Sequence, residues 1–365
     1  MRMFYMMNYL IRKLSRWARL AMLGLFTVSS VAFADPAPTN NQSIVGSGAS
    51  FPAPVYAKWA TNFAQQNNLL VNYQSIGSGG GVKQIKAKLV DFGASDYPLS
   101  AQELDESGLF QFPTLGGGIV MAINLRELND KLVLNGDIIA KIYMGQITKW
   151  NDPAIQALNP DLELPDLFIA VLFRSDGSGT TYNFSKYLSD VSPEFKARFG
   201  VGKAINFPVG LGGKGNEGVA AVLPRVYGAI GYMEYGYAKT MHMGVAAMQN
   251  KYGNIVRASD ESFAHAIAAA DWQTSLAPNV SNLDDAQAWP INAITYVLIH
   301  KDSSKLEILK NYFSFGMLGQ QAETKDLMYV PFNSQVAEFI LNHPSTFSSS
   351  VKTTSSAKSL ETPAP

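Results

Sequence analysis

The 365-residue sequence contains no cysteine. Thiol catalysis, thiolate metal sites and disulfide bridges are therefore excluded, and the fold must depend on core packing. Histidine is also scarce, and the four present (His242, His265, His300 and His343) lack the spacing of a metal-binding motif such as H-E-x-x-H. We expect neither a metal site nor a cofactor.

Charged residues make up only 16% of the chain, against 47% hydrophobic residues. This composition is typical of a globular protein. At this length the chain can bury a substantial core, and the length favours two lobes or domains.

The first 34 residues predict a secretory signal peptide. Five basic residues between Arg2 and Arg19 precede a mostly apolar, uncharged stretch at 20–33, and Ala32-Phe33-Ala34 fits a small-x-small site with cleavage after Ala34. The apolar run is shorter than the ~20 residues that a spanning helix requires. An uncleaved N-terminal anchor is the alternative, whereas the absence of cysteine excludes a lipoprotein anchor.

Removal of this leader leaves 24 basic and 29 acidic residues, a formal charge of −5. Because a mildly acidic protein is a poor general binder of nucleic acid, we expect no nucleic-acid partner. If the protein captures an anion, it must do so with local donors and dipoles and not with a global positive field.

The stretch from Arg174 to Thr181 follows an apolar, strand-like run at 168–173 and precedes an amphipathic helical pattern. A turn between a strand and a helix aims free backbone N–H groups outward, where the helix dipole favours an anion. Ser178 adds a hydroxyl donor, as does Thr180, and Arg174 adds a planar cation suited to an oxyanion.

Asp176 does not fit an ordinary anion site, because a carboxylate repels an anion unless the ligand brings a proton to donate. Asp176 therefore favours a protonated oxyanion such as hydrogen phosphate over sulfate. The alternative is that Asp176 is a turn or N-cap residue that forms a salt bridge with Arg174.

Similar turns occur earlier in the chain. A short predicted strand leads to Ser50, which either caps the following helix or presents its hydroxyl to a ligand. A second strand leads to a glycine-rich turn at 76–81, where glycine permits close approach of the backbone to a ligand. A third strand, 91–95, ends at Asp96. Strand ends beside such turns are where α/β sheets bind ligands.

Common nucleotide and hydrolase motifs fail at single positions. A Walker motif would need glycine at Pro208 and serine or threonine at Gly215. The G-x-G-x-x-G pattern is interrupted by Phe51 in one turn and by Val82 in the other. The G-x-S-x-G pattern of serine hydrolases is absent around Ser50 and around Ser178. These failures argue against a kinase, an ATPase, a dehydrogenase or a serine hydrolase.

Alternating strand and helix patterns predict two mixed-sheet α/β lobes. Gly116-Gly117-Gly118 precedes an apolar strand at 119–124, and Trp289-Pro290 precedes another at 293–299. We expect these two strands to cross between the lobes.

The expected boundaries follow from these crossovers. Lobe I comprises 43–120 and 292–343, with a helix at 334–341, and lobe II comprises the inserted residues 121–291. The composition of residues 344–365, which is dominated by Ser, Thr, Lys, Ala and Pro, predicts a disordered tail.

Several long motifs occur in a fixed order: GASFPAPVYAKW (48–59), GVKQI (81–85), VDFGASD (90–96), DGSGT (176–180) and GLGGKGN (210–216). In these motifs the chain closely resembles the periplasmic phosphate-binding proteins of the bacterial high-affinity phosphate uptake system. The resemblance covers about residues 43–301 and weakens beyond about 315.

The resemblance implies a type II periplasmic binding protein fold, in which two lobes joined by two crossover strands close on phosphate. It further implies a periplasmic, monomeric, non-enzymatic protein that delivers phosphate to an ABC permease in the inner membrane. The family's phosphate contacts fall on Ser50, Phe51, Ser78, Asp96, Arg174, Ser178, Gly179 and Thr180.

In this family the carboxylate matching Asp96 accepts the phosphate proton, and the one matching Asp176 pairs with the arginine. The resemblance thus moves the acceptor role from Asp176 to Asp96. Ser50 stands where the family has threonine, which keeps the hydroxyl, and Gly79 stands where a serine is common, which keeps only the N–H donor.

Three alternatives remain at this point. The ligand could be another protonated oxyanion, such as arsenate, which shares the geometry of phosphate. A secreted phosphatase would need a nucleophile or a metal cluster, and the sequence offers neither. A structural or adhesive surface protein is the third alternative, favoured only by the Ser/Thr-rich tail.

Overall fold

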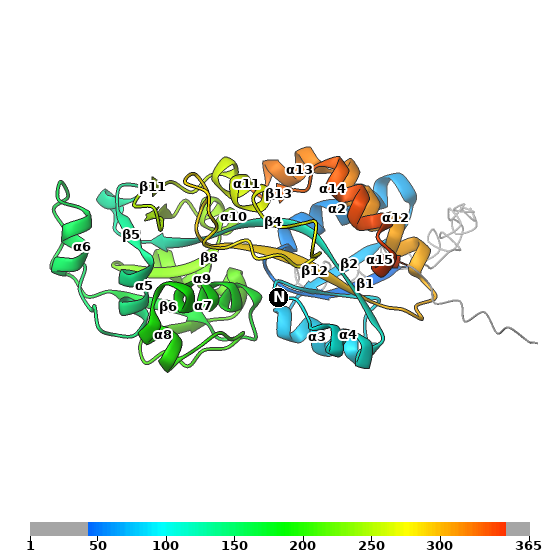
Figure 1. Ribbon diagram of the computed structural model, residues 1–365, viewed down its shortest axis with the longest axis horizontal. Coiled ribbons are helices and arrows are strands. Elements are labelled where there is room, and N and C mark those ends of the chain that lie inside the picture. The colour runs from blue at the N-terminus through cyan, green and yellow to red at the C-terminus, as the bar shows by residue number, and fades with distance from the viewer. Residues whose placement is uncertain (1–42, 348–365) are drawn as a thin grey trace, which may run out of the picture. The chain divides into compact units, whose positions relative to one another are not determined.

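The computed structural model describes residues 43–347 (Figure 1). The predicted signal peptide lies outside the described residues, as does the predicted tail beyond 347. Within 43–347, no helix has both the length and the apolar character needed to cross a membrane.

The strands are β1 Ile44–Gly48, β2 Val71–Ser75, β3 Phe92–Ser95, β4 Leu109–Ile123, β5 Val133–Asn135, β6 Ala170–Arg174, β7 Leu211–Gly213, β8 Ala229–Glu234, β9 Gly244–Val245, β10 Ala247–Gln249, β11 Ile255–Val256, β12 Asn292–His300 and β13 Val330–Pro331. The α-helices are α2 Ala53–Asn67, α3 Ser78–Lys86, α4 Ala101–Ser107, α5 Gly136–Tyr143, α6 Pro153–Leu158, α7 Gly179–Val191, α8 Pro193–Arg198, α9 Gly215–Val222, α10 Tyr235–Thr240, α11 Asp260–Ala268, α12 Leu306–Gly319, α13 Gln321–Asp326, α14 Ser334–Asn342 and α15 Pro344–Phe347, with 3₁₀ turns at Arg126–Leu128 and Leu223–Arg225.

The main sheet has the strand order β2-β1-β3-β12-β4-β8-β6-β7, and β9 and β13 also pair with β4. Strands β2, β1 and β3 are parallel to one another, as are β8, β6 and β7, whereas β12 and β4 are antiparallel to their neighbours. The predicted mixed-sheet α/β fold is therefore confirmed. We call the part with β1, β2 and β3 the first half, and the part with β6, β7 and β8 the second half.

The long strand β4 runs through both halves. Its residues 109–118 pair with β12, and its residues 119–123 pair with β8 (Figure 1). The strand was predicted to begin only after Gly116-Gly117-Gly118, but these glycines lie inside it. A Cβ at Gly116 would lie 2.2 Å from Ile267, and one at Gly118 would lie 2.1 Å from the Phe263 ring, so the glycines let α11 pack directly on the strand.

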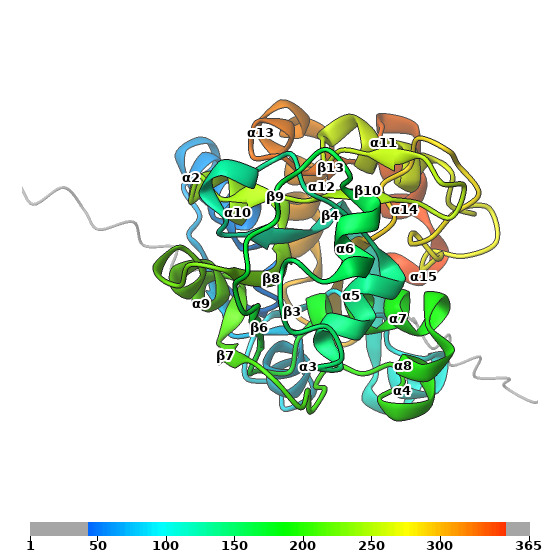
Figure 2. The same cartoon turned by 90° about the vertical axis from the view of Figure 1, so that its left-hand side faces the viewer.

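Helices cover both faces of the sheet in the second half, where α9 lies on one side of β6 and β8 and α5 and α7 lie on the other (Figure 2). In the first half, the predicted buried stripe of Val55, Trp59 and Phe63 on α2 is confirmed. Burial of such apolar stripes is the main stabilising contribution in a chain without disulfides.

Two further predicted boundaries differ from the structure. Strand β6 begins at Ala170 and not at Phe168, whose side chain is 68% exposed, and it continues to Arg174. The first four residues of the predicted tail form helix α15, where Phe347 packs 5.1 Å from Phe112 between ring centroids. An apolar contact that the polar tail composition concealed therefore extends the ordered chain to at least Phe347.

Candidate functional site

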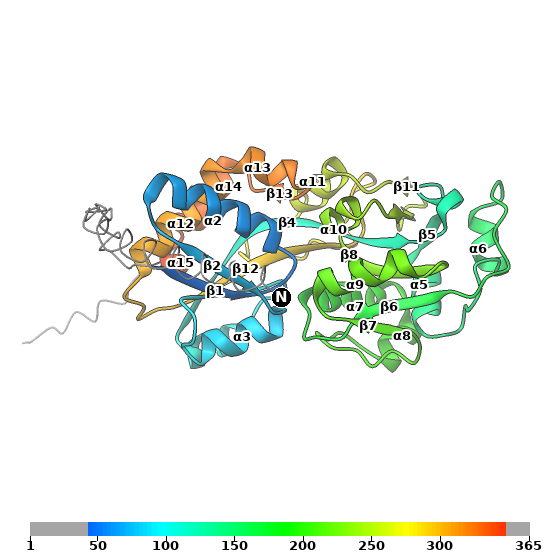
Figure 3. The ribbon, with the colours of Figure 1, turned by 180° about the vertical axis from the view of Figure 1, so that it is seen from behind.

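The site lies where the carboxyl ends of both sets of parallel strands meet, which is the usual binding place in open α/β sheets. In Figure 3, α3 of the first half and α7 and α9 of the second half lie on either side of this junction. Each parallel strand of the main sheet has a buried polar residue at its end or within three residues after it. These residues are Ser50 after β1, Ser78 after β2, Asp96 after β3, Arg174 at the end of β6, Asn216 after β7 and Glu234 at the end of β8.

Direct hydrogen bonds join the two halves around this site. The Gly79 amide donates to the Gly177 carbonyl at 2.8 Å, and the Gly179 amide donates to Ser78 Oγ at 3.1 Å. Asn183 Nδ2 donates to the Asp96 carbonyl at 2.6 Å. The structure therefore brings together turns that lie about 100 residues apart in the chain.

Arg174 is held by Asp176 in a two-pronged ion pair. Its Nε donates to Oδ1 at 2.8 Å and its Nη2 donates to Oδ2 at 2.6 Å, and the two side chains are 1% and 10% exposed. The Gly215 amide also donates to Asp176 Oδ1 at 3.0 Å. Burial works to raise the pKa of Asp176, but the hydrogen bonds and charge of Arg174 outweigh it and lower that pKa. Asp176 is thus an ionised anchor for the arginine.

The remaining Arg174 nitrogen, Nη1, donates to Thr180 Oγ1 at 3.1 Å. The same oxygen accepts from Asn216 Nδ2 at 3.4 Å. A hydroxyl oxygen has two acceptor sites and one proton to donate. With both acceptor sites engaged, the Thr180 hydroxyl can serve a ligand only as a donor.

Two serines of the first half are arranged in the same way. Ser50 Oγ accepts from the backbone N and from Nδ2 of Asn216, both at 3.0 Å. Ser78 Oγ accepts from the amides of Gly179 and Asp96, at 3.1 and 3.2 Å. Of the two roles considered for Ser50, the capping role is excluded, because α2 begins after Pro52 without a side-chain cap. The Ser50 proton is thereby left to donate to an oxyanion, whereas Ser78 directs its single proton to Asp96 Oδ2 at 3.4 Å.

Ser178 and Gly179 form the start of helix α7. Ser178 Oγ accepts from the Thr181 amide at 3.0 Å, which makes it the N-cap, and Gly179 is the first helical residue. A Cβ at Gly179 would lie 2.5 Å from Asp96 Cβ and 2.6 Å from Ser78 Oγ. Only glycine therefore permits this helix end to approach the first half so closely.

Asp96 is 2% exposed and is held by two hydroxyls. Thr295 donates to Oδ1 at 2.7 Å, and Ser78 lies 3.4 Å from Oδ2. Burial raises the pKa of Asp96 to about 7, even though the Thr295 hydrogen bond and the charge of Arg174 lower it. This carboxyl group can gain or lose a proton near neutral pH.

Phe51 is fully buried, and its carbonyl oxygen lies 2.6 Å from the hydroxyl of Tyr329. That hydroxyl is also 2.7 Å from Oε2 of Glu234. Burial raises the pKa of Glu234 to about 8. The single hydroxyl proton of Tyr329 cannot be donated to both oxygens. Both contacts are hydrogen bonds when Tyr329 donates to the Phe51 carbonyl and a protonated Glu234 donates to Tyr329.

Sequence reasoning missed four residues that organise this site: Asn216, Glu234, Thr295 and Tyr329. Asn216 ends the glycine-rich motif 210–216, and Thr295 lies in the predicted apolar strand 293–299, so for these two a polar residue in or beside such a stretch was the available signal. The sequence offered no such signal for Tyr329. Glu234 ends the apolar strand β8, and Thr295 lies within the mostly apolar strand β12.

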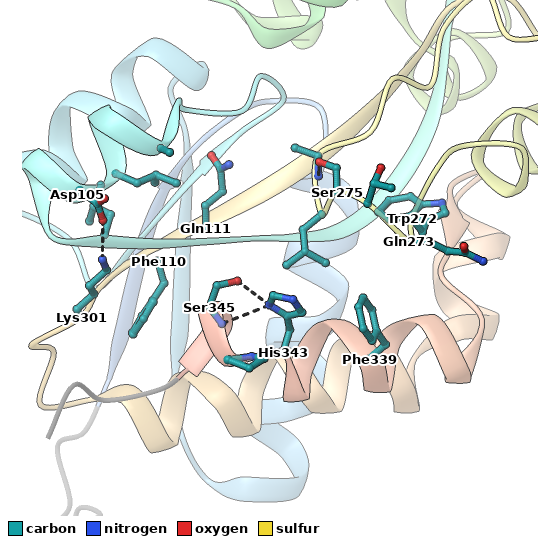
Figure 4. A pocket seen from close by; sticks show the side chains of 17 residues that line it. Asp105, Phe110, Gln111, Trp272, Gln273, Ser275, Lys301, Phe339, His343 and Ser345 are labelled. Carbon is teal, nitrogen blue, oxygen red and sulfur yellow. Dashed lines mark hydrogen bonds and ion pairs between the residues drawn. The ribbon is translucent and has the colours of Figure 1, made fainter.

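The structure also has a pocket of ≈ 650 Å³ away from this junction, bounded by β4, the 272–277 loop and α14 (Figure 4). None of the predicted site residues lines it. Its cation Lys301 is paired with Asp105 at 3.1 Å. Among residues 43–347, no group of three or more His, Cys, Asp or Glu side chains could hold a metal ion.

The fold and the donor-lined junction define a substrate-binding protein of the type II periplasmic binding protein class. The profile of the PBP superfamily domain matches residues 34–317. The chain is 46% identical to the phosphate-binding protein PstS of Pasteurella multocida over 308 residues, which are 83% of this chain and 90% of that protein. The chain belongs to the PstS family of phosphate-binding proteins, as the sequence motifs predicted.

Two further comparisons agree. The PstS protein of Haemophilus influenzae is 46% identical over 305 residues, 82% of this chain and 91% of that protein. The crystal structure of a phosphate-binding protein from Stenotrophomonas maltophilia superimposes with a TM-score of 0.61 at 16% identity, covering 82% of this chain and 93% of that one. At this identity the crystal structure supports the shared fold alone.

Proposed function

We propose that this protein binds inorganic phosphate at the junction of the two halves and delivers it to an ABC permease of the inner membrane. The phosphate-binding residues are Ser50, Phe51, Ser78, Asp96, Arg174, Ser178, Gly179 and Thr180. The observation that carries this proposal is the set of hydroxyls whose acceptor sites are filled by N–H donors, next to the anchored Arg174. Such a set offers donors and one positive charge, which suits a tetrahedral oxyanion.

Asp96 gives the site its preference for an oxyanion that carries a proton. Oδ1 is occupied by Thr295, and Oδ2 has only the long 3.4 Å contact with Ser78, so Oδ2 is the atom placed to accept a proton from hydrogen phosphate. Sulfate has no proton to give at neutral pH and would leave a buried carboxylate repelled and unpaired. Sites built around a hydrogen bond reject ligands that cannot make it by up to ~10⁴-fold or more.

The binding mode requires that the two halves separate and close. We assign lobe I to 43–120 and 292–343, and lobe II to 121–291, with β4 and β12 as the crossovers. The direct bonds from Gly79 to Gly177 and from Gly179 to Ser78 support a closed arrangement. The chain acts as a periplasmic monomer exported by its signal peptide, and it carries phosphate without catalysing a reaction.

Calorimetric titration of protein stripped of bound anion, with phosphate, arsenate and sulfate, tests this function. We expect tight binding of phosphate and rejection of sulfate. In Asp96→Asn, sulfate rejection should relax more than phosphate affinity falls. Absence of phosphate binding, or tighter binding of arsenate than of phosphate, would overturn the assignment of the ligand, and unchanged sulfate rejection in the variant would overturn the role of Asp96.

A further inference from the structure

Asn216 is buried at 0% exposure in the first turn of α9, immediately after β7. Its Oδ1 accepts from the backbone amide of Glu234 at 3.2 Å, at the end of the neighbouring strand β8. Because that partner is a donor, the amide orientation is fixed: the oxygen must face Glu234, and Nδ2 must face the hydroxyls.

The two protons of Nδ2 point to hydroxyls from opposite halves. Ser50 Oγ of the first half lies 3.0 Å away, and Thr180 Oγ1 of the second half lies 3.4 Å away. The backbone N of Asn216 adds a second donor to Ser50 Oγ at 3.0 Å. Both acceptor sites of Ser50 are thus filled by one residue of the other half.

We propose that Asn216 is a positioning residue that turns the Ser50 and Thr180 hydroxyls into donors toward the bound anion, and does so only when the halves meet. This inference rests on the proposed phosphate site and adds to it a link between closure and donor direction. Asn216 itself needs no contact with phosphate, because it acts through the lone pairs of the two hydroxyls. Thr180 has Arg174 as a second donor, so Ser50 depends more fully on Asn216.

The isosteric change Asn216→Asp is the sharpest probe. It keeps an oxygen for the Glu234 amide but replaces the Nδ2 donor with an acceptor. The Ser50 and Thr180 hydroxyls would then donate to the new carboxylate and turn away from the ligand. Each hydrogen bond lost to a charged partner corresponds to about a 10- to 100-fold loss of affinity.

A double-mutant cycle separates this role from a merely structural one. Phosphate affinity is measured by calorimetry for the unmodified protein, Ser50→Ala, Asn216→Asp and the double variant, with thermal unfolding of each ligand-free protein. Asn159→Asp is the control, because Asn159 is also buried but caps β5 outside the site.

We expect Asn216→Asp to weaken phosphate binding by ~100-fold when Ser50 is present. In the Ser50→Ala background the same change should weaken phosphate binding by no more than ~10-fold. Asn159→Asp should lower the unfolding temperature without changing phosphate affinity. Equal losses in both backgrounds would overturn the positioning role while leaving phosphate binding intact. If the unmodified protein does not bind phosphate, the proposed function fails and this inference falls with it.

Discussion

The hydroxyl of Thr295 donates a 2.7 Å hydrogen bond to Oδ1 of Asp96, and this bond ties strand β12 to the end of β3. The carbonyl of Thr295 in turn accepts from Thr114 Oγ1 at 3.2 Å on the adjacent strand β4. The carboxyl group that we assign to proton recognition is therefore oriented by β12 and β4, the two strands that we assign as crossovers between the lobes. Its other oxygen, Oδ2, is left on the side of Ser78 and the second half.

Replacing Thr295 should change the pH dependence of binding. The Thr295 hydrogen bond lowers the pKa of Asp96, which burial otherwise raises. In Thr295→Val that pKa should rise further above about 7, so less of the carboxylate is available at neutral pH to accept the phosphate proton. We expect phosphate affinity at pH 7 to fall by about 10- to 100-fold relative to the unmodified protein, with a smaller deficit at pH 8.5.

Thr295→Ser is the matched control for this prediction, since it keeps the hydroxyl. Calorimetric titrations at several pH values compare each variant with the unmodified protein at the same pH, which cancels the titration of phosphate itself. A deficit that is the same at every pH, or one that appears equally in Thr295→Ser, would contradict the orienting role of this hydroxyl.

Gly179→Ala should prevent closure while leaving the fold intact. The added Cβ would meet Asp96 Cβ at 2.5 Å and Ser78 Oγ at 2.6 Å, and both atoms belong to the first half, whereas Gly179 starts α7 in the second half. Alanine also favours a helix over glycine by up to ~1 kcal/mol. If the halves move as separate lobes, phosphate affinity should fall by ~100-fold or more, and the ligand-free unfolding temperature should not fall.

Gly319→Ala serves as the control, because a Cβ there would have its nearest neighbour, Phe315, at 4.0 Å. Small-angle X-ray scattering with and without phosphate reports whether each protein compacts on binding. A Gly179→Ala protein that binds and compacts normally would show that the two halves do not need this close approach, and a large drop in its ligand-free stability would show that they do not separate.

The local features of the site were predictable from the sequence, and the long-range ones were not. The turns at Ser50, Ser78 and Arg174 are marked by glycine and hydroxyl residues beside apolar runs, and these signals depend only on neighbouring residues. Asn216 contacts Ser50 and Thr295 contacts Asp96, and in both pairs the partner lies more than 100 residues away. Such pairings depend on strand order, which one sequence does not specify.

The same limit explains the misplaced start of β4. Glycine usually weakens a strand, so three consecutive glycines predicted a turn. In the structure they remain within the strand, because Phe263 and Ile267 of α11 occupy the space that side chains at Gly116 and Gly118 would need. That packing partner lies about 150 residues further along the chain.

Glu234→Gln should remove part of the protein's sensitivity to alkaline pH. Burial raises the pKa of Glu234 to about 8, against ~4.3 in an unfolded chain. Because the pKa is raised in the folded state, protonated Glu234 makes its full contribution to stability below about pH 4. That contribution is lost as the pH rises from there toward 8. Within that window the loss is at most ~1.4 kcal/mol per pH unit.

Glutamine mimics the protonated acid, since it can donate to Tyr329 and accept from the Gly236 amide, which now donates to Glu234 Oε1 at 2.8 Å. We therefore expect Glu234→Gln to be as stable as the unmodified protein at pH 5 and more stable at pH 8. Urea unfolding in phosphate-free buffer at pH 5, 6, 7 and 8 provides the measurement. Because Asp96 also has a raised pKa, the unmodified protein is the reference at each pH. Parallel stability curves for the two proteins would mean that Glu234 is ionised in the folded state.

Asp176→Asn should destabilise the ligand-free protein, and phosphate should restore much of the loss. The change removes the countercharge from an arginine that is 1% exposed, and breaking a buried ion pair in this way costs ~3–5 kcal/mol. A bound phosphate anion supplies a new countercharge to Arg174, so the phosphate-induced rise in unfolding temperature should be larger in the variant than in the unmodified protein.

The matched control is Asp137→Asn, which breaks an exposed pair with Lys141 at 2.7 Å and should cost well under ~1 kcal/mol. Differential scanning calorimetry with and without phosphate gives both quantities. An equal phosphate shift in all three proteins would show that Arg174 does not face the bound anion.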